Sequence, residues 1–96
     1  MVEEHCEATL EIRNLYGLHM RPAMMLAELS ATFESEIKVK SGELEVDGKS
    51  VAEVMMLGLP NGAKMDIVAY GDDAARAIEA IKELVEVRLF DEEAAQ

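Results

Sequence analysis

The 96-residue chain lacks most features that mark secreted or membrane proteins. Its single cysteine excludes an internal disulfide and agrees with a reducing compartment. Its longest apolar runs are only a few residues, for example residues 54–57, so no segment is long enough to span a bilayer. The first six residues have neither the basic start nor the apolar stretch of a signal peptide. We therefore expect a cytoplasmic protein.

Positive charge is also scarce. The chain has 9 Lys and Arg residues against 20 Asp and Glu residues, which gives a formal net charge of −11 at pH 7. Such a charge repels nucleic acid and anionic lipid, so we expect neither as a partner and no insertion into a membrane. A protein partner with a basic surface would be attracted. Solubility alone would explain the acidity equally well, and composition does not separate the two explanations.

The length and the apolar content, 50% of residues, predict one domain with a small core. We place this domain at residues 1–90. The last six residues, Asp-Glu-Glu-Ala-Ala-Gln, are predicted to form an acidic tail over residues 91–96.

Four segments alternate apolar and polar residues, which predicts strands with one buried face. Their inward positions are Ala8, Leu10 and Ile12; Ile37 and Val39; Leu44 and Val46; and Met65, Ile67 and Ala69. Three segments have helical spacing: residues 20–33, residues 50–59, and a last helix that follows an N-cap at Asp72. The order is β-α-β-β-α-β-α, and strands with one apolar face predict an α+β fold in which helices cover one face of a mostly antiparallel sheet.

Residues 17–23, Gly-Leu-His-Met-Arg-Pro-Ala, combine groups that suit an anion. Gly17 lets the backbone turn into a helix start, so that His19 stands at or next to the N-cap. A helix N-terminus offers unpaired N–H groups to a phosphate, and Arg21 adds a fork of donors. A neutral imidazole there could attack phosphorus without a separate base, whereas Pro22 makes the first turn rigid. The segment predicts phosphoryl transfer through His19, although a histidine that only caps the helix explains the residues almost as well.

The same segment resembles the active-site motif of HPr, the histidine-containing phosphocarrier of the bacterial phosphotransferase system, and departs from its usual form only at Met20. The resemblance covers about residues 7–88. It includes Asn14, Lys49, Ser50, Val54, Met55, Leu57, Gly58, Gly62, Gly71 and Asp72. It implies an open-faced β-sandwich of four antiparallel strands and three helices, in the element order given above.

The resemblance implies a phosphocarrier and not an enzyme. Such proteins take a phosphoryl group from enzyme I, which phosphoenolpyruvate has charged, and hold it on Nδ1 of the histidine that matches His19. They pass it to IIA components of sugar permeases or, in paralogues, to nitrogen-regulatory counterparts, and the sequence does not choose between these acceptors. Arg21 is expected to contact the phosphoryl group. The resemblance implies no metal or organic cofactor and a monomeric protein.

Two further sets of residues are candidates for contacts with partners. Met20, Pro22, Val51 and Met55 are expected to form a docking surface near two helix starts. Ser50 begins the Ser-x-x-Glu form of a capping box, which explains it structurally. The resemblance adds that HPr kinase/phosphorylase modifies the matching serine in many bacteria, so a regulatory HPr-like module is the alternative function. Ala52 and Glu53 depart from the pattern of those proteins.

His5 and Cys6 look like two metal ligands. Adjacent ligands without a second pair are a weak indication of zinc, and we expect no metal site. A flexible N-terminal segment is the interpretation that we favour for these two residues.

Overall fold

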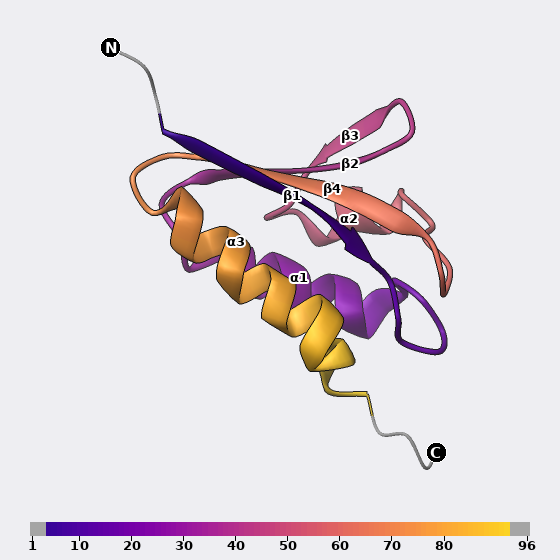
Figure 1. Ribbon diagram of the computed structural model, residues 1–96. Coiled ribbons are helices and arrows are strands. Elements are labelled where there is room, and N and C mark those ends of the chain that lie inside the picture. Colours follow the sequence, from indigo (N-terminus) through magenta and orange to yellow (C-terminus); the bar gives the residue numbers. More distant parts are fainter. Residues whose placement is uncertain (1–3, 93–96) are drawn as a thin grey trace.

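In residues 4–92, which the computed structural model describes, four strands form one antiparallel sheet and three helices cover one of its faces (Figure 1). The strands are β1 (His5–Glu11), β2 (Glu36–Ser41), β3 (Leu44–Asp47) and β4 (Lys64–Tyr70), and the helices are α1 (Met20–Ala31), α2 (Val51–Met55) and α3 (Ala74–Lys82). α3 continues into a π-helical turn, Glu83–Val87. A 3₁₀ turn follows over Leu89–Asp91, which we call the C-terminal turn. The predicted element order and α+β fold class are confirmed.

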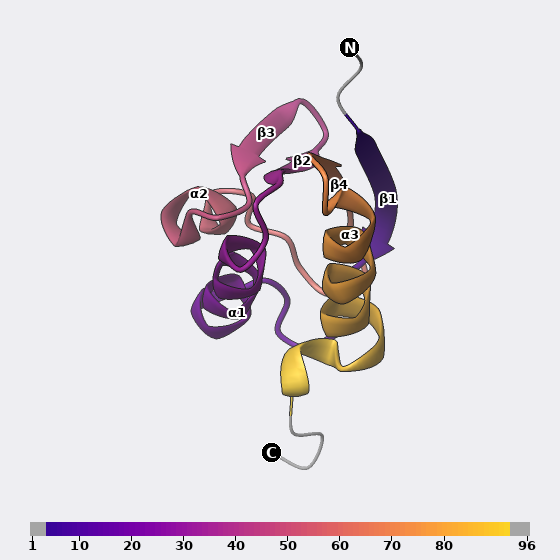
Figure 2. The ribbon, with the colours of Figure 1, turned by 90° about the vertical axis from the view of Figure 1, so that its left-hand side faces the viewer.

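The strand order in the sheet is β1-β4-β2-β3, and every neighbouring pair is antiparallel. Ile67 in β4 lies opposite Ala8 of β1 on one side and Val39 of β2 on the other. Val39 in turn lies opposite Val46 of β3. Because side chains alternate across a strand, this register brings the apolar residues of all four strands to one face. The three helices lie on that face (Figure 2).

The core fills the space between this face and the helices. Its fully buried residues on the sheet side include Leu10, Ile12, Ile37, Val39, Met65, Ile67 and Ala69, and those from the helices include Ala23, Leu26, Val54, Ala77 and Ile81. Burying each large aliphatic side chain contributes about 1.5–3 kcal/mol to stability. The predicted inward positions are confirmed with two exceptions: Ala8 is half-buried, and Leu44 is 40% exposed at the hairpin end of the edge strand β3.

The interpretation of His5 and Cys6 as a flexible segment is wrong. Both belong to β1, where His5 lies opposite Tyr70 and Cys6 opposite Ala69. The rings of His5 and Tyr70 also stack, with centroids 5.6 Å apart. Through this pairing with β4, β1 begins at His5, three residues before Ala8, the first predicted inward position. Within residues 4–92, no group of three or more potential metal ligands is assembled.

Two helices end earlier than predicted. α1 ends at Ala31 and not at Phe33, because the backbone N–H and the hydroxyl of Thr32 both bond to the carbonyl of Leu29. α2 ends at Met55, four residues early, and a turn carries the chain to Gly58, where φ is +58°.

None of the helices in the described part of the chain has the length and apolar content that a membrane crossing needs.

The N-cap predicted at Asp72 is wrong. Asp73 occupies the capping position of α3, and its carboxylate makes no bond to that helix. It accepts instead from the backbone N–H of Glu34 (2.8 Å), the backbone N–H of Ser35 (2.9 Å) and the Ser35 hydroxyl. Asp73 thereby ties the start of α3 to the loop before β2. The Ser35 hydroxyl, followed by the Glu34 N–H, lowers the pKa of Asp73 from 3.8 to about 2.

This tether predicts how the stability of the protein depends on pH. A carboxyl whose pKa is lower in the folded state stabilises the fold at pH values above its unfolded pKa, and the contribution is lost as pH falls through the folded pKa. We therefore expect Asp73→Asn to lower the melting temperature at pH 7. The difference from the wild type should shrink between about pH 4 and pH 2, where the wild type loses the same contribution.

Thermal unfolding followed by circular dichroism at pH 7, 4, 3 and 2 measures this difference. Asp72→Asn is the matched control, because Asp72 is exposed and adjacent. The tether would be contradicted if Asp73→Asn and Asp72→Asn had the same melting temperature at pH 7.

Candidate functional site

The loop between β1 and α1 is fixed to the segment that follows α2. The backbone N–H of Leu18 donates to the carbonyl of Leu59 over 2.8 Å, and the Leu18 side chain is buried. Gly17 approaches the same carbonyl so closely that a Cβ atom would lie only 2.4 Å from the oxygen. Its φ of +74° is also one that side chains with a Cβ rarely adopt. The glycine is therefore required for the loop to reach its position.

His19 is the N-cap residue of α1, as the sequence predicts. Its carbonyl accepts the N–H of Ala23 over 2.9 Å, whereas its side chain makes no capping hydrogen bond. The ring is exposed, and the ring of Tyr16 lies edge-on to it at 6.5 Å. The N–H groups of Met20 and Arg21 lie in the first helical turn, where the helix offers no acceptor. The structure thus presents a free imidazole beside an open helix end, and the imidazole does not serve as the cap.

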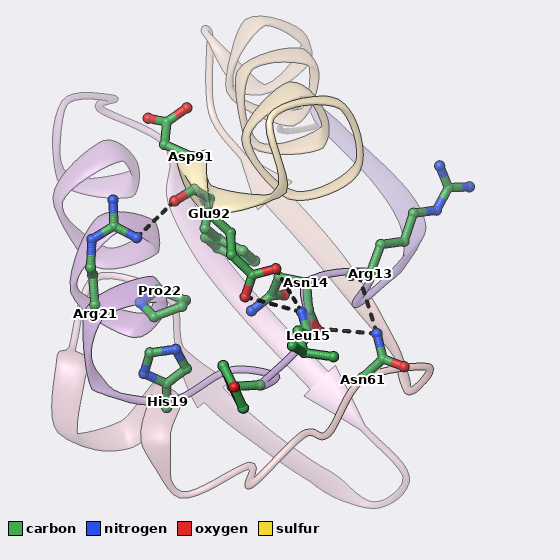
Figure 3. Close-up of a pocket in the computed structure, with 11 residues that line it drawn as sticks. Arg13, Asn14, Leu15, His19, Arg21, Pro22, Asn61, Asp91 and Glu92 are labelled. Atoms are coloured by element: carbon green, nitrogen blue, oxygen red, sulfur yellow. Dashed lines mark hydrogen bonds between the residues drawn. The ribbon is translucent and has the colours of Figure 1, made fainter. Parts of the chain in front are cut away.

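A pocket of about 530 Å³ lies beside His19 (Figure 3). It brings together three segments that are far apart in the sequence. Its lining consists of Arg13, Asn14, Leu15, Tyr16, His19, Arg21, Pro22, Asn61, Phe90, Asp91 and Glu92. Among them, His19, Arg21 and Pro22 are predicted site residues, and Asn14 belongs to the resemblance. The wall formed by residues 90–92 could not be predicted, because no spacing pattern relates these residues to His19.

Arg21 is exposed and reaches over the pocket toward the C-terminal turn. Its Nη1 atom donates to the carbonyl of Phe90 over 3.1 Å. A guanidinium carries five N–H donors, so this bond leaves donors for an anion at His19. Phe90 itself is fully buried, which fixes the position of its carbonyl. Arg21 is therefore held at the rim of the pocket by a hydrogen bond to an uncharged carbonyl.

The side chains of Asn14 and Asn61 form hydrogen bonds with the backbone of the loop. The Asn14 side chain is buried and donates through Nδ2 to the carbonyl of Gly17 over 2.6 Å. Asn61 donates through Nδ2 to the carbonyls of Asn14 (3.1 Å) and Arg13 (3.2 Å). These bonds satisfy backbone acceptors that the irregular loop leaves free. They hold the backbone that leads to His19.

The predicted docking residues differ in exposure. Met20 is 56% exposed and Met55 is 37% exposed, whereas Val51 is half-buried and Pro22 is buried. Pro22 therefore has little surface to offer a partner. α1 and α2, which carry these residues, pack side by side (Figure 2). The docking role of all four residues stays a prediction.

Ser50 is the N-cap of α2, and its hydroxyl accepts the N–H of Glu53 over 3.2 Å. The second hydrogen bond of a capping box, from the N–H of Ser50 to the carboxylate of Glu53, is not formed, so this part of the prediction is wrong. The carboxylate of Glu53 accepts from the N–H of Asp47 over 3.0 Å, and the N–H of Ser50 donates to the carbonyl of Asp47. The N–H of Ser50, which a capping box would pair with the carboxylate of Glu53, is therefore paired with the carbonyl of Asp47 in the turn before α2. Phosphorylation of Ser50 stays a prediction.

The first residues of the predicted acidic tail contact the domain. Asp91 forms an ion pair with Arg88, in which Nε lies 3.0 Å from Oδ1. This hydrogen-bonded pair raises the pKa of Arg88 and lowers the pKa of Asp91. Glu92 accepts the N–H of Leu15. Residues 93–96 lie outside the described residues, and the division into a domain over 1–90 and a tail over 91–96 stays a prediction.

The chain is similar in sequence and structure to known phosphocarrier proteins. Residues 6–87 match the family model PTS-HPr, the PTS HPr component phosphorylation site. The chain is 41% identical over 83 residues to the phosphocarrier protein NPr of Proteus mirabilis, which covers 85% of this chain and 91% of that protein. The crystal structure of an HPr from Thermoanaerobacter tengcongensis superposes with a TM-score of 0.87 and 39% identity, covering 92% of this chain and 98% of that one.

A third relative is much longer than this chain. The phosphoryl donor subunit DhaM of the PEP-dependent dihydroxyacetone kinase of Providencia stuartii is 36% identical over 75 residues, or 78% of this chain. This chain spans only 16% of the length of that protein. The similarity therefore concerns one part of DhaM.

The close approach at Gly17 predicts the effect of a single methyl group. In Gly17→Ala, the left-handed conformation of residue 17 becomes unfavourable, which should lower the free energy of unfolding by about 1–2 kcal/mol. The steric clash with the Leu59 carbonyl should lower it by about a further 1–3 kcal/mol. Gly42→Ala is the control, because Gly42 has φ +60° with open space around it and should lose only the first amount. Urea unfolding measures both free energies. Equal losses for the two variants would show that the contact with Leu59 does not constrain the loop.

Proposed function

The chain belongs to the HPr family of phosphocarrier proteins, and from this premise we propose that His19 accepts a phosphoryl group from phosphorylated enzyme I and passes it to IIA components of the sugar phosphotransferase system. One observation carries the proposal. An exposed imidazole that caps nothing stands at the open N-terminus of α1, and Arg21 lines the same pocket. HPr-family proteins are carriers and not catalysts, so the group is held only between two transfers.

The geometry supports a direct transfer to the ring. A lone pair of His19 Nδ1 attacks phosphorus, the bond between phosphorus and the donor breaks, and its electron pair leaves with the donor. The N–H groups of Met20 and Arg21 and the guanidinium of Arg21 would then surround the phosphoryl oxygens. Phosphoryl transfer needs mainly positioning and charge stabilisation, which these groups supply. The reverse sequence delivers the group to the acceptor.

Enzyme I and the IIA components would dock on the exposed methionines of α1 and of the C-terminal end of α2, which include the C-cap residue Met56. Met20, Met24, Met55 and Met56 are all at least 37% exposed. Methionine side chains are flexible and polarizable, which suits a surface that must fit several partners in turn. The net charge of −11 favours partners with basic surfaces. We place this relay in the cytoplasm, with the carrier as a monomer.

The alternative is a regulatory HPr-like module, either with a nitrogen-regulatory acceptor or controlled by HPr kinase/phosphorylase at Ser50. The similarity to a carrier of the NPr type favours testing the first form. In the second form, a phosphate on the N-cap residue of α2 would be tolerated by the helix and would add negative charge near the docking methionines. Transfer rates from phosphorylated His19 to purified sugar-type and nitrogen-type IIA components decide between the two branches.

The first test concerns the acceptor. His19→Ala should abolish labelling by enzyme I and radioactive phosphoenolpyruvate, and the circular dichroism spectrum should stay unchanged because the exposed ring makes no capping bond. His5→Ala removes the other histidine and should leave labelling intact. Acid-labile labelling of the His19→Ala protein would refute the assignment.

The second test concerns the phosphate contact. Arg21→Ala should lower the rate of phosphoryl transfer from enzyme I by about 100-fold, because one charge-stabilising donor group is lost. The folded state should change little, since Arg21 is exposed. Rapid-quench kinetics measures the rate, and Arg76→Ala, an exposed arginine on α3, is the control. An Arg21→Ala rate equal to that of the control would exclude the proposed role.

A further inference from the structure

The pocket beside His19 contains a carboxylate from the far end of the chain. The backbone N–H of Leu15 donates to both carboxylate oxygens of Glu92, over 2.8 and 3.1 Å (Figure 3). Glu92 and His19 line the same pocket. An N–H donor that faces a pocket is a natural contact for an anion. In the unmodified protein, an anionic group of the chain itself occupies this donor.

The negative charge of Glu92 has no ion-pair partner among residues 4–92, whereas that of the neighbouring Asp91 has one. Asp91 has the guanidinium of Arg88 as an ion-pair partner. Among residues 4–92, no cation lies within ion-pair distance of Glu92, which is held by the neutral N–H of Leu15. A phosphoryl group on His19 would bring a charge of about −2 into the same pocket. Coulomb repulsion between the two groups would then act directly on Glu92.

Arg21 would be drawn away at the same time. It is bonded to the neutral carbonyl of Phe90, and a phosphoryl group is a stronger acceptor because the bond to it is charge-assisted on both sides. Glu92 and the Phe90 carbonyl belong to the same short segment, at and just after the C-terminal turn. Phosphorylation therefore weakens two of the contacts that hold this segment, and both changes favour its release.

The C-terminal turn itself has a conformation that favours release. Leu89, Phe90 and Asp91 have φ values of +51°, +56° and +56°, and none of them is a glycine. Side chains with a Cβ rarely adopt this region, so the turn persists only while surrounding contacts hold it. Those contacts are the buried Phe90 ring, the Arg88–Asp91 pair, and the two bonds at the pocket.

We propose that Glu92 is a positioning residue of the phosphoacceptor site, whose carboxylate holds the C-terminal segment on Leu15 while His19 is unmodified and leaves the pocket when His19 carries a phosphoryl group. The proposal rests on the proposed function. It makes residues 90–92 a reporter of the state of His19. The charge of Glu92 also raises the free energy of the phosphorylated state, which favours onward transfer.

The test uses the full chain and a chemical donor. Potassium phosphoramidate transfers its phosphoryl group to an imidazole nitrogen: the new P–N bond forms as the original one breaks, and ammonia leaves. In a His5→Gln background, His19 is the only imidazole. Amide hydrogen exchange of Leu15, followed by ¹⁵N NMR, then compares the unmodified and phosphorylated proteins. We expect exchange to be at least about 10-fold faster after phosphorylation. An unchanged rate would overturn the proposal.

Charge and structure are separated by matched variants. Glu92→Gln keeps an acceptor for Leu15 and removes the charge, so the equilibrium should shift about 5-fold toward phosphorylated His19 at low salt. This shift should disappear in high salt, which a merely structural role would not produce. Glu86→Gln is the control, because Glu86 also accepts a backbone N–H, that of Glu11 at 2.9 Å, outside the pocket. Equal behaviour of the Glu92→Gln and Glu86→Gln proteins would overturn the proposal.

The two proposals can fail separately. Labelling by enzyme I can be absent while phosphoramidate still modifies His19 and releases Leu15, which would refute the proposed function and support the role of Glu92. Normal labelling by enzyme I with no change at Leu15 would do the reverse.

Discussion

The site depends on the contact between the backbone of Gly17–Leu18 and the carbonyl of Leu59. That contact fixes a loop with a positive φ at Gly17, and the loop decides where α1 begins and which residue stands at its N-cap. His19 is presented to solvent because the backbone, and not the imidazole, makes the first helical bond. The N–H groups of the first turn are then free for an anion. The exposed ring makes no capping hydrogen bond, and this observation supports the proposed role of His19.

The second half of the site is supplied by the end of the chain. The C-terminal turn brings Phe90 and Glu92 against residues that precede them by some 70 positions. Three left-handed residues cost about 1–2 kcal/mol each, which is comparable to the 3–5 kcal/mol that a buried Phe side chain contributes. The turn is thus held by a narrow balance, in which Phe90 in the core opposes the strain of the backbone. Contacts at the pocket can tip such a balance, so the state of His19 and that of the C-terminal segment are coupled.

Much of the fold could be predicted from the sequence, because alternation and helical spacing are local patterns that follow directly from burial of one face. The motif around His19 also predicts a site for an anion, because a glycine, a histidine and an arginine at these spacings combine groups that suit one. What could not be predicted is which partner a polar side chain selects. Asp73 bonds to Ser35 across the fold and not to its own helix, and Glu53 accepts the nearby N–H of Asp47 and not that of Ser50. No sequence pattern predicts the wall of the pocket formed by residues 90–92, because this wall exists only once α3 has packed against the sheet.

The proposed function requires that one ring nitrogen of His19 carries the phosphoryl group. Phosphorus NMR of the protein incubated with enzyme I and phosphoenolpyruvate tests it most directly, because the chemical shift and the coupling to ring nitrogens distinguish the two nitrogens of an imidazole. We expect a single phosphohistidine resonance from Nδ1 of His19, which disappears when an acceptor component is added. A resonance from another residue, or a His19 signal that no acceptor discharges, would contradict it.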